Sequence, residues 1–595
     1  MKKKSPLIRL LENIKERDKE IFCLCLLYTI ITPLVSLFGI ILPKVLISYL
    51  TEREATNQGI IIIVSVFFAF GALIYFLKQW LQDSTYPRIT ELRIDYIRDQ
   101  CVKLLNMDYP YMESATFLEK YNKALESTSN NSEGIEGIYH KLFELPQLGT
   151  IVLVLAFFIG FKNPIILLAI LVNIGVTTLI SVYVQKYEYK RKEALAKKER
   201  RVYYYGKVSK DFMYGKDVRV YSLKDRIDDN FRLEIKGYID VFKVIKNREY
   251  ALGFITLATL FLSDLATYGV LTYLTFKGMS ISDYSMYVIA ASTLSLQMTT
   301  LSENITFIMR EYLYVRDFYE FMDADLGEHG GDLKAIPKEE SMAIEFKNVT
   351  FAYPGTDKYI LKDFSLTIPK GQKLAIVGIN GAGKTTFVKL LTGLFKVNEG
   401  EILINGININ EYKKIELYKM FGAVFQEVNI LALTIAQNIA CTLENVDYKK
   451  LDKVLKQVGL YEKVYELKDN VNTTMLKIID ENGVVFSGGE SQKLAIARAL
   501  YKGGNCVIMD EPTAALDALA EAEIYNKFDL LTEGKTAIYI SHRLASTKFC
   551  DAIALLDETG LREYGTHDEL MENKGSYYDM FVTQGKYYQE GGESA

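Results

Sequence analysis

A glycine-rich segment with the sequence GINGAGKTT, at Gly378–Thr386, has the residue types and spacing that hold phosphate groups. It matches the pattern G-x-x-x-x-G-K-[ST] and lies between the apolar stretch KLAIVG and a segment with helical spacing. In such a loop the glycines let backbone N–H groups approach phosphate oxygens, Lys384 reaches the β- and γ-phosphates, and Thr385 ligates Mg²⁺. The predicted phosphate contacts are Gly378, Asn380, Gly381, Ala382, Gly383, Lys384, Thr385 and Thr386.

Two carboxylates end a second apolar stretch, in the sequence CVIMDEPTAALD. Downstream of a phosphate loop, Asp510 is expected to hold the Mg²⁺ shell, and Glu511 to orient or deprotonate an attacking water molecule. An Asp-Glu pair at the end of a strand is usually only surface charge, so this interpretation depends on the loop upstream. Together with that loop, the pair predicts hydrolysis of a nucleoside triphosphate.

A second candidate anion site has the sequence FSGGESQK and runs from Phe486 to Lys493. Ser487, Gly488 and Gly489 stand at a predicted helix start, where exposed N–H groups, a hydroxyl and the positive end of the helix dipole favour an anion. One nucleotide-binding domain would then contain two phosphate sites, about a hundred residues apart. The chemistry of the two motifs does not by itself explain this duplication.

Long uncharged stretches fill the first half of the chain and must position this domain at a membrane. A helix needs roughly 20 apolar residues to cross a bilayer, so each stretch predicts a membrane span. Asp264 interrupts the fifth span, and either a contact with substrate or protons or a solvated structural role would explain a charge there. Six spans are predicted, the last being the least apolar: Ile21–Leu42, Gln58–Leu77, Leu145–Phe161, Asn163–Gln185, Ala251–Phe276 and Tyr284–Ser302.

Two inserts of about 65 residues separate spans two and three and spans four and five. The stretch Lys186–Arg201, just after span four, holds eight Lys or Arg in sixteen residues, whereas the opposite links hold one or two each. The positive-inside rule therefore places both inserts and both termini in the cytosol. Ahead of the first span, Leu7, Leu10, Leu11 and Ile14 recur at helical spacing, which favours an amphipathic helix on the membrane surface over a solvated leader.

The composition indicates a membrane part and a soluble part, because the mean hydropathy is slightly positive although 24% of residues are charged. The net charge of −4 gives no support to a nucleic-acid partner, and the six cysteines lack a paired zinc-ligand spacing and are expected as free thiols. The expected fold is multidomain, with an all-α transmembrane domain of six helices and an α/β P-loop ATPase domain. The expected boundaries are an amphipathic segment at 1–20, the transmembrane domain at 21–322, a linker at 323–341, the nucleotide-binding domain at 342–583 and a tail at 584–595, whose last stretch, QEGGESA, is expected to be disordered.

Taken jointly, these motifs resemble those of the ATP-binding cassette (ABC) transporter superfamily. FSGGE is similar to the signature sequence of that family, which most often reads LSGGQ. The resemblance covers Ala343 to about Thr583 motif by motif, and the six-span layout covers the rest more loosely. The resemblance identifies five further positions: Tyr353 as the aromatic that stacks on adenine, Gln426 as the Q-loop, Glu481 as the acidic X-loop residue, Ala515–Asp517 as the D-loop and His542 as the switch histidine.

The resemblance explains the two phosphate sites, because in this family the signature serves ATP bound to a second cassette. Ser487, Gly488 and Gly489 would close over a γ-phosphate held by the partner's phosphate loop, with Asp517 at the same seam. This chain has one cassette and therefore resembles an exporter-type half-transporter. The resemblance implies a second half-transporter as partner, in a homodimer or a heterodimer.

The resemblance also implies roles around ATP and Mg²⁺, the expected cofactors. It assigns catalysis to Glu511, His542 and Gln426, Mg²⁺ binding to Thr385, Gln426 and Asp510, and base stacking to Tyr353. Two residues depart from the commonest signature, because Phe486 replaces Leu and Glu490 replaces Gln and adds a negative charge. They are expected as tolerated variants, with a weakened ATP site as the alternative.

The two cytosolic inserts gain a role from the same resemblance, since exporters of this family end each insert in a short coupling helix that docks on a cassette. The candidates are Met107–Phe117 and Tyr214–Asp225, and the resemblance implies that the second crosses to the partner's cassette. ATP binding would close the cassettes and turn the cavity outward, and hydrolysis would reset it.

The expected function is ATP-driven export or flipping of a peptide, a lipid or an amphipathic small molecule by alternating access. The alternatives are an exporter-fold importer with siderophore-like cargo, a membrane protein that ATP gates without pumping, and a soluble ABC ATPase, which the six predicted spans disfavour. The expected partners are a second half-transporter, the lipid bilayer and an unidentified substrate, with no nucleic acid. The expected location is the cytoplasmic membrane, most simply a bacterial inner membrane, as a multi-pass protein with its N-terminus and ATPase domain in the cytosol.

Overall fold

The computed structural model describes residues 4–51, 56–327, 330–333, 340–512, 532, 534–558 and 560–590. The chain divides into two compact units. The first comprises Met1–Leu105 and Leu118–Asp325, and the second comprises Asn106–Phe117 and Leu326–Ala595. A short piece of the first predicted insert thus belongs to the same unit as the nucleotide-binding domain.

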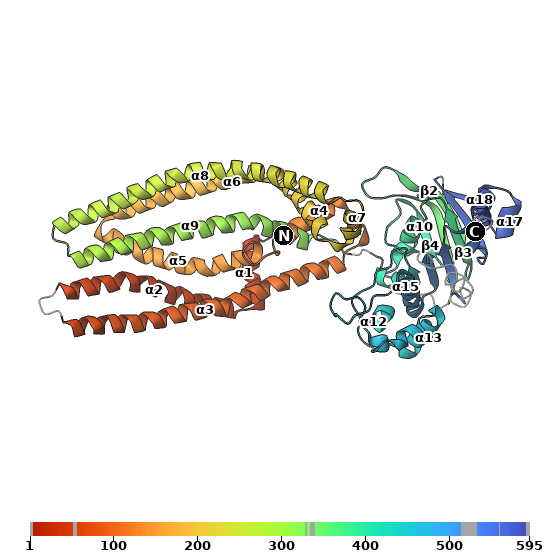
Figure 1. Ribbon diagram of the computed structural model, residues 1–595, viewed down its shortest axis with the longest axis horizontal. Coiled ribbons are helices and arrows are strands. Elements are labelled where there is room, and N and C mark those ends of the chain that lie inside the picture. Colours follow the sequence, from red (N-terminus) through yellow and green to blue (C-terminus); the bar gives the residue numbers. More distant parts are fainter. Residues whose placement is uncertain are drawn as a thin grey trace. The chain divides into compact units, whose positions relative to one another are not determined.

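The first unit is built from long helices, of which α6 and α8 lie side by side (Figure 1). Asn163 makes the turn between α5 and α6, because its side chain accepts a hydrogen bond of 2.9 Å from Ile165 N and Pro164 supplies the first helical position. Ser280 caps α9 in the same way, through Asp283 N. The helices are α1 (Pro6–Arg17), α2 (Glu20–Leu50), α3 (Asn57–Leu105), α4 (Ala115–Glu126, which begins in the second unit), α5 (Gly134–Lys162), α6 (Pro164–Lys210), α7 (Gly215–Val220), α8 (Lys224–Phe276) and α9 (Ile281–Asp323).

Five described helices are long and apolar enough to cross a membrane: α2, α3, α5, the Pro164–Glu188 part of α6, and α8. They contain the first five predicted spans. The sixth predicted span, Tyr284–Ser302, lies inside the 43-residue α9, which does not reach the same hydropathy. Its span therefore stays a prediction that rests on helix length and on its place after α8.

The N-terminal helix α1 differs from the expectation of a helix resting on a membrane surface. Leu10 and Ile14 are buried, at 0% and 5% exposure, in a protein core shared with α3, α5 and α9. Ile8 and Leu11 remain exposed. The apolar stripe predicted the helix correctly, but much of that stripe packs against protein.

The second unit contains two sheets. One has the strand order β2-β1-β4-β5 with antiparallel neighbours, and the other has the order β10-β9-β3-β8-β7-β6, in which only the β10–β9 pair is antiparallel among the described strands. The strands are β1 (Ile344–Ala352), β2 (Tyr359–Ile368), β3 (Lys373–Gly378), β4 (Glu399–Ile404), β5 (Ile407–Asn408), β6 (Phe421–Val424), β7 (Cys506–Asp510), β8 (Thr536–Ile540), β9 (Ala552–Asp557) and β10 (Gly560–Gly565).

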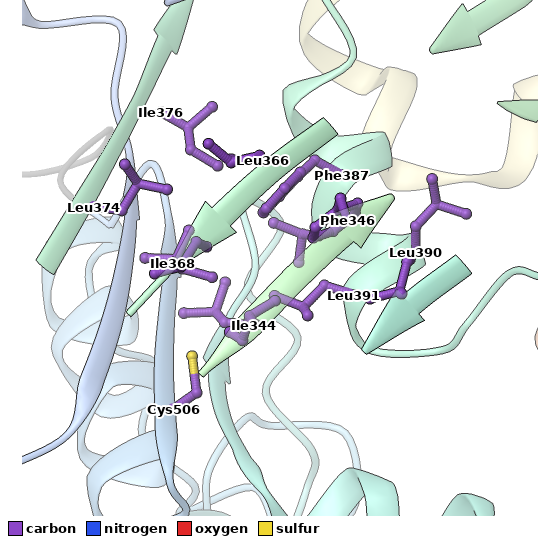
Figure 2. Close-up of a cluster of buried hydrophobic side chains, with 14 of the residues drawn as sticks. Ile344, Phe346, Leu366, Ile368, Leu374, Ile376, Phe387, Leu390, Leu391 and Cys506 are labelled. Carbon is purple, nitrogen blue, oxygen red and sulfur yellow. The ribbon is translucent and has the colours of Figure 1, made fainter. Parts of the chain in front are cut away.

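A buried apolar cluster joins the two sheets to helix α10 (Lys384–Leu391) (Figure 2). Phe387 of α10 stacks on Phe346 of β1 with ring centroids 4.4 Å apart, and Cys506 of β7 is fully buried in the same cluster. Since α10 follows the phosphate loop directly, this packing fixes the loop on the sheet.

The described part of the second unit contains seven further α-helices. They are α11 (Lys414–Lys419), α12 (Ile435–Ala440), α13 (Tyr448–Val458), α14 (Tyr461–Glu466), α15 (Gly488–Lys502), α17 (His567–Glu572) and α18 (Ser576–Glu590). The disorder expected for the final stretch QEGGESA does not hold for Gln589 and Glu590, which belong to α18. All six cysteines are free, as expected.

Candidate functional site

The phosphate loop runs from the end of β3 to the start of α10, as its sequence predicts. Gly381 and Gly383 have φ angles of +86° and +88°, which favour glycine. At Gly378 an added Cβ would lie 2.1 Å from the backbone oxygen of Leu556, so glycine is needed for a close approach. The glycine positions of the motif are therefore required by backbone geometry.

Lys384 is buried at 6% exposure and folds back over the loop. Its Nζ donates hydrogen bonds of 2.8 Å to Gly378 O and 2.9 Å to Ile379 O. Burial lowers the pKa of Lys384, against the opposing effect of the Glu511 and Asp510 charges. A buried cation on a glycine-rich loop at a helix start is suited to a polyphosphate.

Asp510 ends strand β7 and is almost fully buried, at 1% exposure. Burial, followed by the neighbouring charge of Glu511, raises its pKa to about 6, while a hydrogen bond with the Thr385 side chain opposes that shift. Among the described residues, its Oδ2 has no hydrogen-bond partner. An orphaned carboxylate oxygen beside a threonine hydroxyl is a donor set that fits Mg²⁺, which prefers oxygen ligands.

The carboxylate of Glu511, the next residue, is contacted by side chains from two other segments. Gln426, two residues beyond β6, donates from Nε2 to Glu511 Oε2 over 3.1 Å, and Nε2 of His542 pairs with Oε1. Glu511 has a φ of +50°, a strained angle for a residue with a side chain. Three residues predicted for catalysis from distant parts of the sequence thus meet at one carboxylate.

Two glutamines hold this group in place and were not identified from the sequence. Gln492 Nε2 donates to Glu511 O over 3.0 Å, and Gln584 Nε2 donates to His542 O over 2.7 Å. Gln584 also accepts a hydrogen bond of 3.0 Å from Leu544 N. Gln492 lies within the signature segment, but the sequence assigns it no role of its own, and Gln584 lies in the expected tail.

Tyr353, the predicted base-stacking residue, lies just past strand β1. Its hydroxyl shares a hydrogen bond of 3.0 Å with Thr386 Oγ1, and its ring meets the edge of Phe395 at 5.2 Å. Thr386, a predicted phosphate contact, is therefore buried beside the tyrosine. Thr385, Asn380 and Gly381 are exposed at the surface of the loop.

The signature segment begins helix α15, with exposed Ser487 as its N-cap. Ser487 and Glu490 form a capping box, in which Glu490 Oε2 accepts from Ser487 N over 2.9 Å and Ser487 Oγ accepts from Glu490 N over 3.4 Å. Gly488 and Gly489 occupy the first turn, where the N–H groups of a helix are free to bind an anion. The helix start predicted for this segment is thus present.

The two departures from the commonest signature contact the same lysine. Lys463 of α14 forms an ion pair with Glu490, and its Nζ lies 5.6 Å from the ring centroid of Phe486. Burial acts to raise the pKa of Glu490, but hydrogen bonds from Lys463 and Ser487 outweigh it and hold that pKa below its ordinary value. The extra negative charge is therefore neutralised within the cassette.

Other predicted residues stand apart from this centre. The D-loop, Ala515–Asp517, lies outside the described residues. Glu481 and Asp264 are both exposed, Asp264 on α8 of the first unit. Their predicted roles stay predictions.

The two predicted coupling segments have different surroundings. Tyr109 of the first segment packs against the apolar cluster of the second unit, and its ring meets Phe395 at 5.6 Å. The second segment, Tyr214–Asp225, includes α7 of the first unit and exposes Val220 (75%) and Tyr221 (70%), and Phe212 (97%) and Met213 (76%) are exposed just before it.

Comparison with known proteins gives relatives of one kind. The family model described as ABC transporter matches residues 361–514. The chain is 28% identical to the subtilin transport ATP-binding protein SpaT of Bacillus subtilis over 583 residues, which cover 95% of this chain and 91% of that protein. It is 35% identical to the ATP-dependent lipid A-core flippase of Haemophilus influenzae (strain 86-028NP), over 45% of this chain and 44% of the flippase.

Among solved structures, the chain is similar to a bacterial Atm1-family ABC exporter with ATP bound. The TM-score is 0.81 at 20% sequence identity, and the match covers 95% of this chain and 99% of that one. The likeness therefore extends over both units, at the level of the fold.

Proposed function

Since this chain belongs to the ABC transporter superfamily, with the exporter fold and the transport-coupled ATPase that membership implies, we propose that it works as a dimer of half-transporters that exports its cargo by alternating access. It is a multi-pass membrane protein. Its ATPase domain and N-terminus lie in the cytosol in this proposal, and the membrane is the cytoplasmic one.

The convergence on Glu511 is the observation that carries the ATPase assignment. Gln426 and His542 both contact its carboxylate, and the charges of Glu511 and Asp510 act on Lys384 of the phosphate loop. A carboxylate oriented from both sides is placed to take a proton from a water molecule. This arrangement supports hydrolysis more directly than ATP binding that only gates.

Hydrolysis in this proposal is an in-line attack of water on the γ-phosphorus of ATP. Glu511 accepts the proton of the water as its oxygen bonds to phosphorus, and the bond to the β-phosphate oxygen breaks with release of ADP. Lys384 stabilises the negative charge on the phosphates, and Tyr353 stacks on the adenine. Mg²⁺, held by Thr385, Asp510 and Gln426, would neutralise phosphate charge when bound.

A second cassette is needed to finish each ATP site in this proposal. Ser487, Gly488 and Gly489 offer N–H groups and a hydroxyl at an exposed helix start, which supports a seat for a partner's γ-phosphate. The exposed apolar side chains around α7 support docking of the second coupling segment on that partner.

Complementation between two inactive variants tests the composite site. Lys384→Ala removes the phosphate-loop cation, and Ser487→Arg blocks the signature, so each variant alone has a defect in both pockets of its dimer. A mixed dimer contains one pocket with both defects and one intact pocket. Coexpression of differently tagged chains and tandem purification should restore ATPase activity to between roughly a tenth and half of the wild-type rate, since one of two pockets works.

Two controls accompany that experiment. ATP binding by the Ser487→Arg chain shows that its own phosphate loop is folded, and a mixed preparation of two Lys384→Ala chains should stay inactive. If the mixed dimer is inactive although both chains are folded and paired, the composite pocket is wrong.

The cargo is the least constrained part of the proposal. A subtilin transport protein matches over most of its length, whereas the flippase alignment spans less than half of each chain. Subtilin, lipid A and an amphipathic drug are therefore the first probes to add to the protein in lipid vesicles. Export predicts that one of them stimulates ATP turnover and accumulates on the side opposite the cassettes, and accumulation on the cassette side would favour an importer.

A further inference from the structure

The side chain of Lys389, on the phosphate-loop helix α10, lies among three aromatic rings. Its Nζ is 5.5 Å from the ring centroid of Tyr353, 5.7 Å from that of Tyr109 and 5.8 Å from that of Phe395. Each distance is within cation–π range. The rings come from three elements: the segment after β1, the first coupling segment and the segment after α10.

The same ammonium group is anchored by a carboxylate of the coupling segment. Lys389 Nζ donates to Glu113 Oε1 over 2.7 Å, and the Tyr109 hydroxyl donates to that same oxygen over 2.8 Å. The Lys389 side chain is 20% exposed and that of Glu113 is 36% exposed, so the pair is partly shielded from solvent. Partial burial makes such a pair worth more than an ordinary surface ion pair.

Tyr353 is held in turn by the phosphate loop. Its hydroxyl is hydrogen-bonded to the Thr386 hydroxyl, and the Phe395 ring packs on the rings of both Tyr353 and Tyr109. A cavity of about 550 Å³ opens between the coupling segment and Tyr353, lined by Asp108, Pro110, Tyr111, Tyr353, Phe395 and Lys396 among others. A shift of the Tyr353 ring toward a base would therefore change the contacts of Lys389, and through them those of Glu113 and Tyr109.

We infer that Lys389 and Glu113 are positioning residues that link the base-stacking Tyr353 to the first coupling segment, so that the segment is seated most firmly when a purine base is bound. The inference rests on the proposed function for the role of Tyr353. It assigns a base-dependent part of ATP affinity to a residue pair that contacts neither phosphate nor cargo.

The test uses the full-length protein in lipid and compares ATP with tripolyphosphate, which has the phosphates and no base. Lys389→Met keeps the length of the side chain and removes its charge, and Glu113→Gln removes the anchor. Both should raise the KM for ATP about five- to tenfold with kcat changed less than twofold, and should leave the affinity for tripolyphosphate unchanged, since about 1 kcal/mol corresponds to roughly a fivefold change. Lys389→Arg should keep the wild-type KM.

A matched control is Lys419→Met, which removes a cation paired with Glu416 at 2.9 Å elsewhere on the cassette, and it should change neither affinity. In a Tyr353→Ala background, Lys389→Met should have no further effect on the KM for ATP. The inference is overturned if Lys389→Met weakens ATP and tripolyphosphate equally, or if its effect persists without Tyr353. If the wild-type chain hydrolyses no ATP at all, the proposed function fails instead.

Discussion

The phosphate loop and the signature segment are both phosphate sites by sequence, but the structure completes them to different degrees. At the phosphate loop, Lys384 is buried, Asp510 ends strand β7, and Glu511 directly after it contacts the side chains of Gln426 and His542. In the signature, Ser487 is exposed and its hydroxyl is used by the capping box of its own helix. One site brings its predicted catalytic side chains together within the chain, whereas the other leaves a helix start exposed.

The largest expected effect comes from the completed site. Glu511→Gln removes the proton acceptor but keeps the shape of the side chain, so ATP turnover should fall by roughly 10²- to 10⁴-fold. ATP binding should remain, because Lys384 and the glycines of the loop are untouched. Single-turnover ATPase assays and equilibrium binding measure the two quantities separately. If Glu511→Gln kept full turnover, Glu511 would not be the proton acceptor. The phosphate loop would then differ less from the signature segment.

In the signature segment, by contrast, we expect a substitution to affect ATP turnover only when a second cassette is present. Ser487→Ala removes the N-cap, which costs about 1 kcal/mol at the start of α15, and takes a hydroxyl from the partner's γ-phosphate. Turnover should fall about 10- to 100-fold while ATP affinity of the phosphate loop in the separated chain stays the same. Ser487→Thr keeps the cap and should retain most activity. If Ser487→Ala instead weakened ATP binding by the separated chain as much as it slows turnover, Ser487 would act on the phosphate loop of its own chain.

The completed site was largely predictable from the sequence, because a phosphate loop is a local structure. Its glycines, Lys384 and the carboxylates after β7 stand in short motifs whose backbone requirements can be read residue by residue. The contacts of Gln492 and Gln584 were not predictable, since each is a tertiary contact between a glutamine side chain and a backbone carbonyl that no residue spacing predicts. The predicted boundary places Gln584 just outside the nucleotide-binding domain, although it lies in α18 and contacts His542 and Leu544 of that domain.

The pH dependence of stability offers a smaller test within the signature. Glu490 has a pKa held below its ordinary value of 4.5, so it stabilises the folded state above that pH, and this contribution is lost as pH falls through the lower folded-state pKa. Glu490→Gln should therefore destabilise the protein by about 1 kcal/mol at pH 7, and the difference from wild type should narrow below about pH 4.5. Thermal unfolding of the detergent-solubilised chain from pH 7 to pH 3.5 measures it. A difference that is constant across this range would exclude the ionised carboxylate as its source.

The smallest effect is expected at Lys463. Substitution of this lysine tests whether Phe486 and Glu490, the two residues that differ from the commonest signature, are energetically coupled. Its side chain is 48% exposed, so Lys463→Met should cost less than about 1 kcal/mol of stability. Because Lys463 contacts both Glu490 and the ring of Phe486, the effects of Lys463→Met and Glu490→Gln should not be additive, whereas Phe486→Leu should matter only when Lys463 is present. A double-mutant cycle read by thermal unfolding and by ATP turnover tests this coupling. Additive effects in both measurements would mean that Phe486 and Glu490 contribute independently to stability and turnover. Lys463 would then not neutralise the charge of Glu490.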